Sequence, residues 1–265
     1  TGVGFQPDFL WVKDRSATNH HALFDSVRGA GSNGFFTLAS SQTAAEVDVD
    51  HISSLDSDGF TLASGRAQTN NGSNTYVAWN WKAGGTAVSN SNGSITSSVS
   101  AAPNAGFAVG TYTGNATAGA TIGHSLGAIP EMVIVKRRTN ARDWSVYHKD
   151  QSATPTNAYL LLNSTAAVAT GNTAWNNGTF TSSVFTIGSH ELVNANTDSY
   201  VFYAFASVES YSKVGSYVGN ANADGTFVYT GFSPAFVILK ASTVALNWLM
   251  YDNARNEYNV IDNTL

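Results

Sequence analysis

The sequence predicts an all-β protein made of tandem antiparallel β-sandwich units, of jelly-roll or concanavalin-like type, with little helix. Three observations predict it: a strand-like motif that occurs three times, apolar patterns with a two-residue period, and frequent Asn-Gly and Asp-Gly pairs. Internal repeats indicate an array of similar units. Asn-Gly and Asp-Gly pairs between apolar runs mark the turns of β-hairpins.

The repeated motif is a short apolar run that begins with a proline and ends with a lysine. This Pro-Lys motif covers residues 7–13, 130–136 and 234–240. A β-branched and aromatic run directly after a proline is typical of the start of a strand. Its nearly continuous apolar character predicts a strand that is buried on both faces.

A second repeated run predicts a strand with one packed face. Val77, Trp79 and Trp81 share a face by the two-residue period, and residues 201, 203 and 205 repeat the pattern. Large apolar residues persist on this face while the other face varies, so we expect this face to line a core.

The spacing of these runs predicts the organisation of the chain. We expect a first unit over 1–84, a Gly/Ser/Asn-rich linker over 85–105, a second unit over 106–209 and a third unit over 210–265. The second unit has a predicted Tyr-x-Gly-Asn strand at 112–115, which the third unit repeats at 217–220. In this division the first unit has no counterpart of that strand. The third has no counterpart of the runs at 185–189 and 200–203. We expect either a fragment of a longer tandem protein or partner chains that complete the end units.

Composition excludes several classes of protein. The chain has a net charge of −5 without a basic run, so the electrostatic footprint of a nucleic-acid binder is missing. It has 0 cysteines, which excludes disulfides and thiolate metal sites. It has no apolar run of the roughly 18 residues that a membrane span needs. We predict no cofactor, no metal and no membrane insertion.

Two sets of repeated polar residues are candidate ligand-binding groups. Lys13, Lys136 and Lys240 end the three Pro-Lys motifs and could bind an anion or a glycan hydroxyl. The alternative is a lysine at a strand end whose stem covers apolar surface. Asp25 and Asp252 each precede an arginine by three residues and could bind a ligand. The favoured alternative is a turn that an Asp–Arg pair caps, because Asp side chains bond local backbone.

Three further features are candidates for ligand binding or catalysis. Trp175 lies next to a turn outside the repeated strands, so among the tryptophans it is the candidate for an exposed ring that stacks on a sugar; the alternative is a ring that fills the core. His20 and His21 with Asp25 suggest a metal, but His21 takes the place of Trp144 and Trp248, so packing is favoured. Residues 123–127 have the Gly-x-Ser-x-Gly spacing of a nucleophile elbow, but a strand follows where the elbow needs a helix. We therefore predict no catalytic residues.

The motifs together resemble a known kind of domain. The segments 7–13, 20–29, 56–62, 76–84, 112–115 and 229–234 resemble a domain common in uncharacterised phage virion proteins, largely of marine phages and cyanophages, which is described as SPRY-like or concanavalin-like. The resemblance implies a virion structural or tail-fibre protein that is made in the host cytoplasm and exposed on the particle surface. It supplies no catalytic residues.

The leading functional expectation is a non-enzymatic phage virion structural protein, a tail fibre or another virion-surface appendage. Its expected partners are copies of itself and other virion proteins, and host surface glycans are a candidate for attachment. One alternative is a carbohydrate-binding, lectin-like module. Another is a capsid decoration or self-assembling fibre subunit. A polysaccharide depolymerase comes last.

Overall fold

The computed structural model describes residues 2–171 and 173–255, and in these the chain is built almost entirely of antiparallel strands. Strands hold 36% of the residues and helices 4%, which confirms the all-β class. The helices are α1 (Glu191–Asn194) and two 3₁₀ turns, η1 (Pro103–Ala105) and η2 (Pro155–Asn157). Within the described ranges, none is long and apolar enough to cross a membrane.

The largest element is an eight-stranded sheet in the second copy. Its strands, in spatial order, are β15 (Ala169–Thr170), β14 (Ala158–Leu161), β13 (Ser145–His148), β12 (Met132–Arg137), β17 (Ser199–Phe205), β10 (Phe107–Thr113), β9 (Ser97–Ala102) and β8 (Val88–Asn90). The central strands β12 and β17 pair along their whole length, from Met132 opposite Phe205 to Arg137 opposite Tyr200.

Both faces of the central strand β12 are buried, as its continuous apolar run predicts. On β12, Val133 and Val135 point into one core while Ile134 points into another. Successive side chains of a strand point to opposite faces, so a strand between two cores needs apolar residues at every position. The expectation that the Pro-Lys motif is buried on both faces is confirmed for the second copy.

The core that contains Val133 and Val135 lies between the large sheet and a two-stranded sheet. Strands β11 (Ala120–Gly123) and β16 (Val184–Ile187) pair with each other, and their Ile122 and Phe185 pack against residues of the large sheet such as Tyr112 and Phe202. The short helix α1 adds Leu192 and Val193 to this core.

The three Pro-Lys motifs pair with their following strands in the same way. The first copy forms the three-stranded sheet of β2 (Ala22–Asp25), β1 (Phe9–Asp14) and β7 (Tyr76–Trp81), and the third copy forms the ribbon of β18 (Phe236–Leu239) and β19 (Leu249–Asp252). Thus β1–β2, β12–β13 and β18–β19 are equivalent antiparallel pairs. The remaining ribbons of the first copy are β3 (Phe36–Thr37) with β4 (Val47–Asp48) and β5 (Ile52–Asp56) with β6 (Gly59–Leu62).

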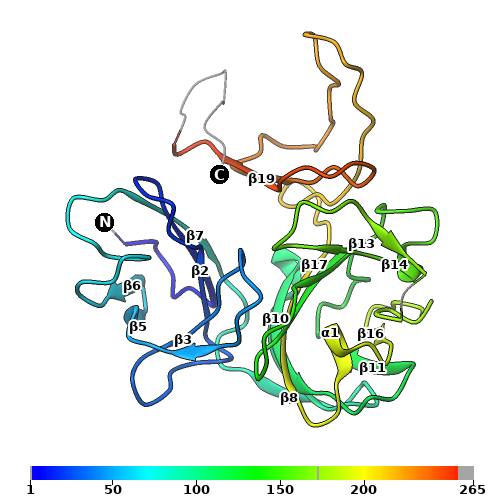
Figure 1. Cartoon of the computed structure of the whole chain (residues 1–265), viewed down its shortest axis with the longest axis horizontal. Coiled ribbons are helices and arrows are strands. Elements are labelled where there is room, and N and C mark those ends of the chain that lie inside the picture. The colour runs from blue at the N-terminus through cyan, green and yellow to red at the C-terminus, as the bar shows by residue number, and fades with distance from the viewer. Residues whose placement is uncertain (1, 172, 256–265) are drawn as a thin grey trace.

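The three copies share a second core. Figure 1 shows them around a common centre, with the first copy in blue and cyan, the second in green and yellow, and β19 of the third above both. Phe9 is central: its ring lies 4.9 Å from Trp81 and 4.3 Å from Tyr203, while Trp81 lies 5.6 Å from Phe236 of the third copy. The predicted face of Val77, Trp79 and Trp81 and its counterpart at 201–205 both lie in this core, so that prediction is confirmed.

Two expectations about local structure are wrong. The segment 85–105 is not a linker, because it contains β8 and β9, which extend the large sheet next to β10. The run at 217–220, which repeats the sequence of 112–115, is not a strand, although its counterpart begins at the end of β10. Within the described residues, this third-copy run lacks the neighbouring strand that β17 provides for β10 in the second copy.

Candidate functional site

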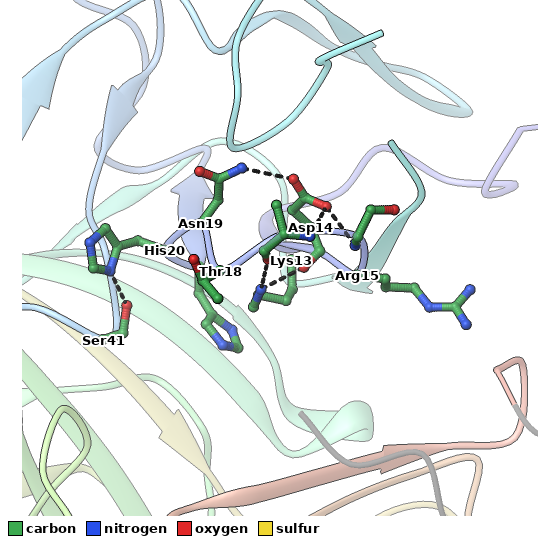
Figure 2. A pocket seen from close by; sticks show the side chains of 10 residues that line it. Lys13, Asp14, Arg15, Thr18, Asn19, His20 and Ser41 are labelled. Carbon is green, nitrogen blue, oxygen red and sulfur yellow. Dashed lines mark hydrogen bonds between the residues drawn. The ribbon is translucent and has the colours of Figure 1, made fainter. Parts of the chain in front are cut away.

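A hollow in the described structure lies at the end of β1. It has a volume of about 540 Å³ and is lined by Lys13, Asp14, Arg15, Ser16, Ala17, Thr18, Asn19, His20, His21 and Ser41. Figure 2 shows Lys13, Asp14 and Asn19 along one side, with His20 and Ser41 across from them. The hollow therefore includes one candidate residue, Lys13, and both adjacent histidines.

Asp14 holds the loop that forms this hollow. Its carboxylate accepts from the backbone N–H of Ser16 at 2.8 Å and from the side-chain amides of Asn19 at 2.8 Å and Asn74 at 2.7 Å. Burial raises the pKa of Asp14, but these hydrogen bonds outweigh burial and lower it overall. Asp14 is not among the site residues predicted from the sequence. The available signal was an acid directly after a strand and before a polar Ser/Thr/Asn run, the composition of an Asx turn.

Lys13 is turned toward the backbone of the same loop. Its ammonium donates to the carbonyl of Ala17 at 3.1 Å and to the carbonyl of Asp14. Partial burial lowers its pKa, and the charge of Asp14 opposes that shift. An ammonium has three donors, so Lys13 can bind a further acceptor in the hollow.

His21 is a neutral side chain with a defined tautomer. The indole N–H of Trp11 donates to His21 Nδ1 at 2.8 Å, so the ring proton belongs on Nε2. Burial, together with the nearby charges of Lys13 and His20, lowers the pKa of His21 to about 4. His20 makes hydrogen bonds to Ser41 at 2.9 Å and to Gln42 at 2.6 Å.

A metal site is not formed by these histidines. Among residues 2–171 and 173–255, the structure contains no group of three or more His, Asp, Glu or Cys side chains that could hold a metal ion. Asp25, the third residue considered with His20 and His21, is buried and paired with Arg28 instead.

The other two candidate lysines join neighbouring copies. Lys136 is fully buried and donates to the carbonyl of Thr43 in the first copy at 3.3 Å and to that of Arg137 at 2.7 Å. Lys240 donates to the carbonyl of Thr165 in the second copy at 3.0 Å. Burial lowers the pKa of both, for Lys136 to about 8. The structure therefore does not bring the three lysines together in one site.

Asp25 and Asp252 cap turns, as the favoured alternative predicts. Each accepts from the backbone N–H of its arginine, at 2.7 Å from Arg28 and 2.9 Å from Arg255, and each forms an ion pair with that guanidinium. Burial raises the pKa of Asp252, but the hydrogen bonds from Arg255 outweigh it and lower the pKa overall. Both carboxylates are buried, with relative exposures of 1% and 6%.

The hypothesis that Trp175 is an exposed ring is wrong, and its alternative, a ring that fills the core, is confirmed. Its relative exposure is 0%, and its ring packs edge-on against Tyr147 at 5.9 Å and Phe180 at 6.0 Å in the core under the large sheet. Trp175 precedes a turn at Asn176 and Asn177, which both have positive φ. The ring beside this turn is buried in the protein, because a large aromatic side chain there removes much apolar area from water.

Comparison with known proteins identifies the family of the chain. No curated protein and no solved structure matches it. A family model described as a domain of unknown function, DUF7483, matches residues 1–265. The chain, with its three Pro-Lys motifs around one shared core, therefore belongs to the DUF7483 family.

Proposed function

We propose that this chain is a non-enzymatic structural subunit of a phage particle, a tail fibre or another appendage of the virion surface, that assembles with copies of itself. We also infer that its copies are sandwich units of the jelly-roll or concanavalin-like type. The virion assignment rests on the resemblance of the repeated motifs to phage virion proteins. The structural role rests on the contacts of the described residues.

The observation that carries the proposal is a set of exposed apolar side chains in the third copy. In the segment 217–229, Val218 is 87% exposed, Phe227 86% and Tyr229 77%. The equivalent position in the second copy is buried. Tyr112 and Tyr217 begin the repeated motif 105 residues apart, and the same spacing pairs Ile122 with Phe227. Ile122 is completely buried. Exposed apolar groups gathered on one segment mark surfaces that bind other proteins.

The repeated polar residues support the same conclusion. Lys136, Lys240, Asp25 and Asp252 bind backbone or arginine side chains within the protein. Their repetition is explained by the need to hold the copies together. The repeated residues thus hold the chain together internally, and the apolar segment 217–229 stays exposed for contacts with other chains. These two features are those expected of a subunit in a larger assembly.

The first test is the oligomeric state. Analytical ultracentrifugation of the chain should show an oligomer, and the double variant Val218→Ser/Phe227→Ser should shift it to monomer. Ile129→Ser is the matched control, because Ile129 is 56% exposed but lies outside the segment. An unchanged oligomer in the double variant, or a monomeric starting protein, would contradict assembly through this segment.

The second test is the place of the protein in a particle. Electron microscopy of virions labelled with antibody against this chain should show label on the tail fibres or another surface appendage. Label confined to the capsid would favour the decoration subunit, and absence from purified particles would overturn the virion assignment.

A second candidate function is carbohydrate binding, which the exposed rings of Phe227 and Tyr229 favour because aromatic faces stack on sugars. Binding on a glycan array should then weaken on Phe227→Ala and Tyr229→Ala replacement while the oligomeric state stays the same. Equal binding by the variants would exclude this segment as the glycan site.

A further inference from the structure

The exposed segment of the third copy repeats a motif that has a partner in the second copy. The motif Tyr-x-Gly-Asn covers residues 112–115 and 217–220. In the second copy it covers the end of β10, which pairs with β17, and the rings of Tyr112 and Tyr200 stack there at 5.2 Å. In the third copy, no strand among the described residues lies beside 217–220. The third copy therefore has one half of this strand pair.

The first copy has the other half. Its strand β7 corresponds to β17, since Tyr76 precedes Tyr200 by 124 residues in matching runs. Strand β7 pairs with β1 along one edge, and within the described chain no strand pairs with its other edge. The N–H of Arg15 donates to the carbonyl of Thr75 at 2.8 Å. By the alternation of an antiparallel ladder, the backbone groups of Tyr76 and of every second residue after it therefore face the free edge.

The tyrosines of the two corresponding strands are held by the same hydrogen bonds. The Tyr200 hydroxyl accepts from the backbone N–H five residues before it and donates to the carbonyl nine residues before it, both at 2.7 Å. The Tyr76 hydroxyl makes the same two bonds at the same spacings, at 2.8 Å and 2.9 Å. The ring that stacks on the motif in the second copy is thus already fixed in the first copy.

Asn70 supplies a second preformed contact. In the second copy, Asn194 Oδ1 accepts from the N–H of Asn115, the last residue of the motif, at 2.8 Å. Asn70 stands 124 residues before Asn194. Its Nδ2 donates to the carbonyl of Ala63 at 2.8 Å, as Asn194 Nδ2 donates to that of Gly188 at 2.8 Å. Asn194 is buried, whereas Asn70 is exposed and its Oδ1 accepts no hydrogen bond from any described residue.

We propose that the segment 212–220 of one chain adds as a strand to the free edge of β7 in a second copy of the chain. The register of β10 on β17, carried over by the two spacings, places Tyr217 opposite Tyr76 and Val218 opposite Thr75. Tyr217 then stacks on Tyr76 as Tyr112 stacks on Tyr200. In such strand addition the backbone hydrogen bonds provide affinity and the side chains provide specificity.

The same register supplies donors for two open oxygens of the acceptor chain. It brings the N–H of Asn220 to Asn70 Oδ1, and it places Lys213 opposite Asn80. Asn80 Oδ1 is buried and has no hydrogen-bond partner in the described structure. Lys213 is exposed, and its ammonium has three donors. The acceptor edge therefore matches this segment in side chains as well as in backbone.

The contact joins two different surfaces of the chain, so it can repeat from chain to chain. Figure 1 shows the orange segment around residue 220 projecting from the body of the molecule. A chain that gives this segment to one neighbour and receives one from another extends head to tail. This inference rests on the proposed self-assembly through the segment 217–229, and it names the surface that the segment binds.

The first test is a disulfide between two single-cysteine variants. The chain has 0 cysteines, so Thr75→Cys and Val218→Cys each introduce the only thiol. In the proposed register these positions form a non-hydrogen-bonded pair with Cα atoms about 4.5 Å apart, within the range of a disulfide. We expect a mixture of the two variants to form a covalent heterodimer on mild oxidation, seen on a non-reducing gel. The matched control is Val228→Cys in place of Val218→Cys, because Val228 is 44% exposed but outside the added strand.

The second test uses a glycine that is crowded only in the proposed contact. At Gly114 a Cβ would lie 2.2 Å from the carbonyl oxygen of Ala195, whereas at Gly219 it meets nothing within 4 Å. Gly219→Ala should therefore leave the thermal stability of the chain unchanged and reduce the disulfide yield severalfold, because its Cβ would collide with the Asn71 carbonyl of the acceptor chain. Gly225→Ala is the control, since a Cβ there also meets nothing within 4 Å. Equal yields from the two glycine variants would contradict the register.

The outcomes separate this inference from the proposed function. If the mixture forms no heterodimer while ultracentrifugation shows an oligomer, the strand addition is wrong and self-assembly stands. If the mixture forms no heterodimer and the protein is a monomer, both are wrong. A disulfide that forms within single chains of the double variant Thr75→Cys/Val218→Cys, but not in the mixture, would also overturn the contact between chains. Circular dichroism of each variant checks that it is folded.

Discussion

Tyr203 of the second copy donates its hydroxyl hydrogen to the carboxylate of Asp25 in the first copy at 2.7 Å, inside the core that the copies share. The same relationship occurs at another junction. Trp79, which stands in the first copy where Tyr203 stands in the second, donates to Asp252 of the third copy at 3.1 Å. Each capping aspartate therefore has two roles. It caps the turn of its own copy and accepts a hydrogen bond from an aromatic side chain of a neighbouring copy.

Removal of the Tyr203 hydroxyl should destabilise the protein. In Tyr203→Phe, Asp25 retains its ion pair with Arg28 but no longer accepts the hydrogen bond from the hydroxyl of residue 203. A hydrogen bond to a charged group such as this carboxylate contributes about 1.5–3 kcal/mol to stability. We expect the free energy of unfolding in urea to fall by that amount. Tyr211→Phe is the matched control, because Tyr211 is 63% exposed and should change stability by less than about 0.5 kcal/mol. Equal effects of the two variants would show that the junction bond contributes nothing.

Lys136 should make stability rise with pH in the alkaline range. Burial lowers its pKa from 10.5 to about 8, so between these values the unfolded chain binds more protons than the folded protein. The free energy of unfolding should therefore increase from pH 8 to pH 10, by up to about 3 kcal/mol. The comparison is with Lys136→Met, which cannot titrate there. A constant stability difference between the two proteins over this range would be inconsistent with a buried, partly neutral lysine.

His21 should make the protein less stable in acid. Its pKa falls from 6.5 to about 4 on folding, so the unfolded chain takes up a proton over this interval and the folded protein does not. The stability that His21 contributes is complete above pH 6.5 and is lost as the pH falls to about 4. The loss amounts to at most about 3 kcal/mol.

Other histidines require that this effect be measured as a difference. Burial also lowers the pKa values of His51, His124 and His148. The unfolding free energy of the protein should therefore be compared with that of His21→Gln at each pH. The difference between them should shrink below pH 6.5. Parallel pH profiles would show that His21 titrates normally.

Truncation of Trp175 should be costly because of its packing. Trp175→Ala would leave a cavity among Tyr147, Phe180 and the large sheet, and such changes cost about 3–5 kcal/mol. Thermal unfolding followed by circular dichroism should show the loss. The control is Tyr229→Ala, since that ring is 77% exposed. A mild effect of Trp175→Ala would mean that the ring does not fill the core.

The exposed positions of the third copy contrast with the buried positions that repeat their sequence. Tyr217 and Tyr112 begin the same four-residue motif, yet Tyr217 is 52% exposed and Tyr112 4%. Sequence similarity between copies cannot predict this difference, because burial depends on the strand that lies alongside. Tyr112 stands opposite Tyr200 on β17, and the described residues of the third copy contain no such strand.

The sequence by itself determined the features that depend on local pattern. Alternating and continuous apolar runs defined the strands around Trp79, Ile134 and Tyr203, and the Asp–Arg spacing predicted the capped turns at Asp25 and Asp252. Strand geometry and Asx turns involve residues only a few positions apart, so their signals are readable in one short window.

Only the tertiary structure decided what lies between distant segments. The β9 strand is a run of serine, alanine and valine that becomes a strand because it pairs with β10. Lys136 contacts Thr43, 93 residues away, and the Trp175 ring packs against Tyr147 and Phe180, which no periodicity of the sequence marks. Such contacts depend on how whole sheets pack against each other. Because of that packing, Lys136 and Lys240, which the sequence offers as ligand-binding residues, instead bind the backbone of a neighbouring copy.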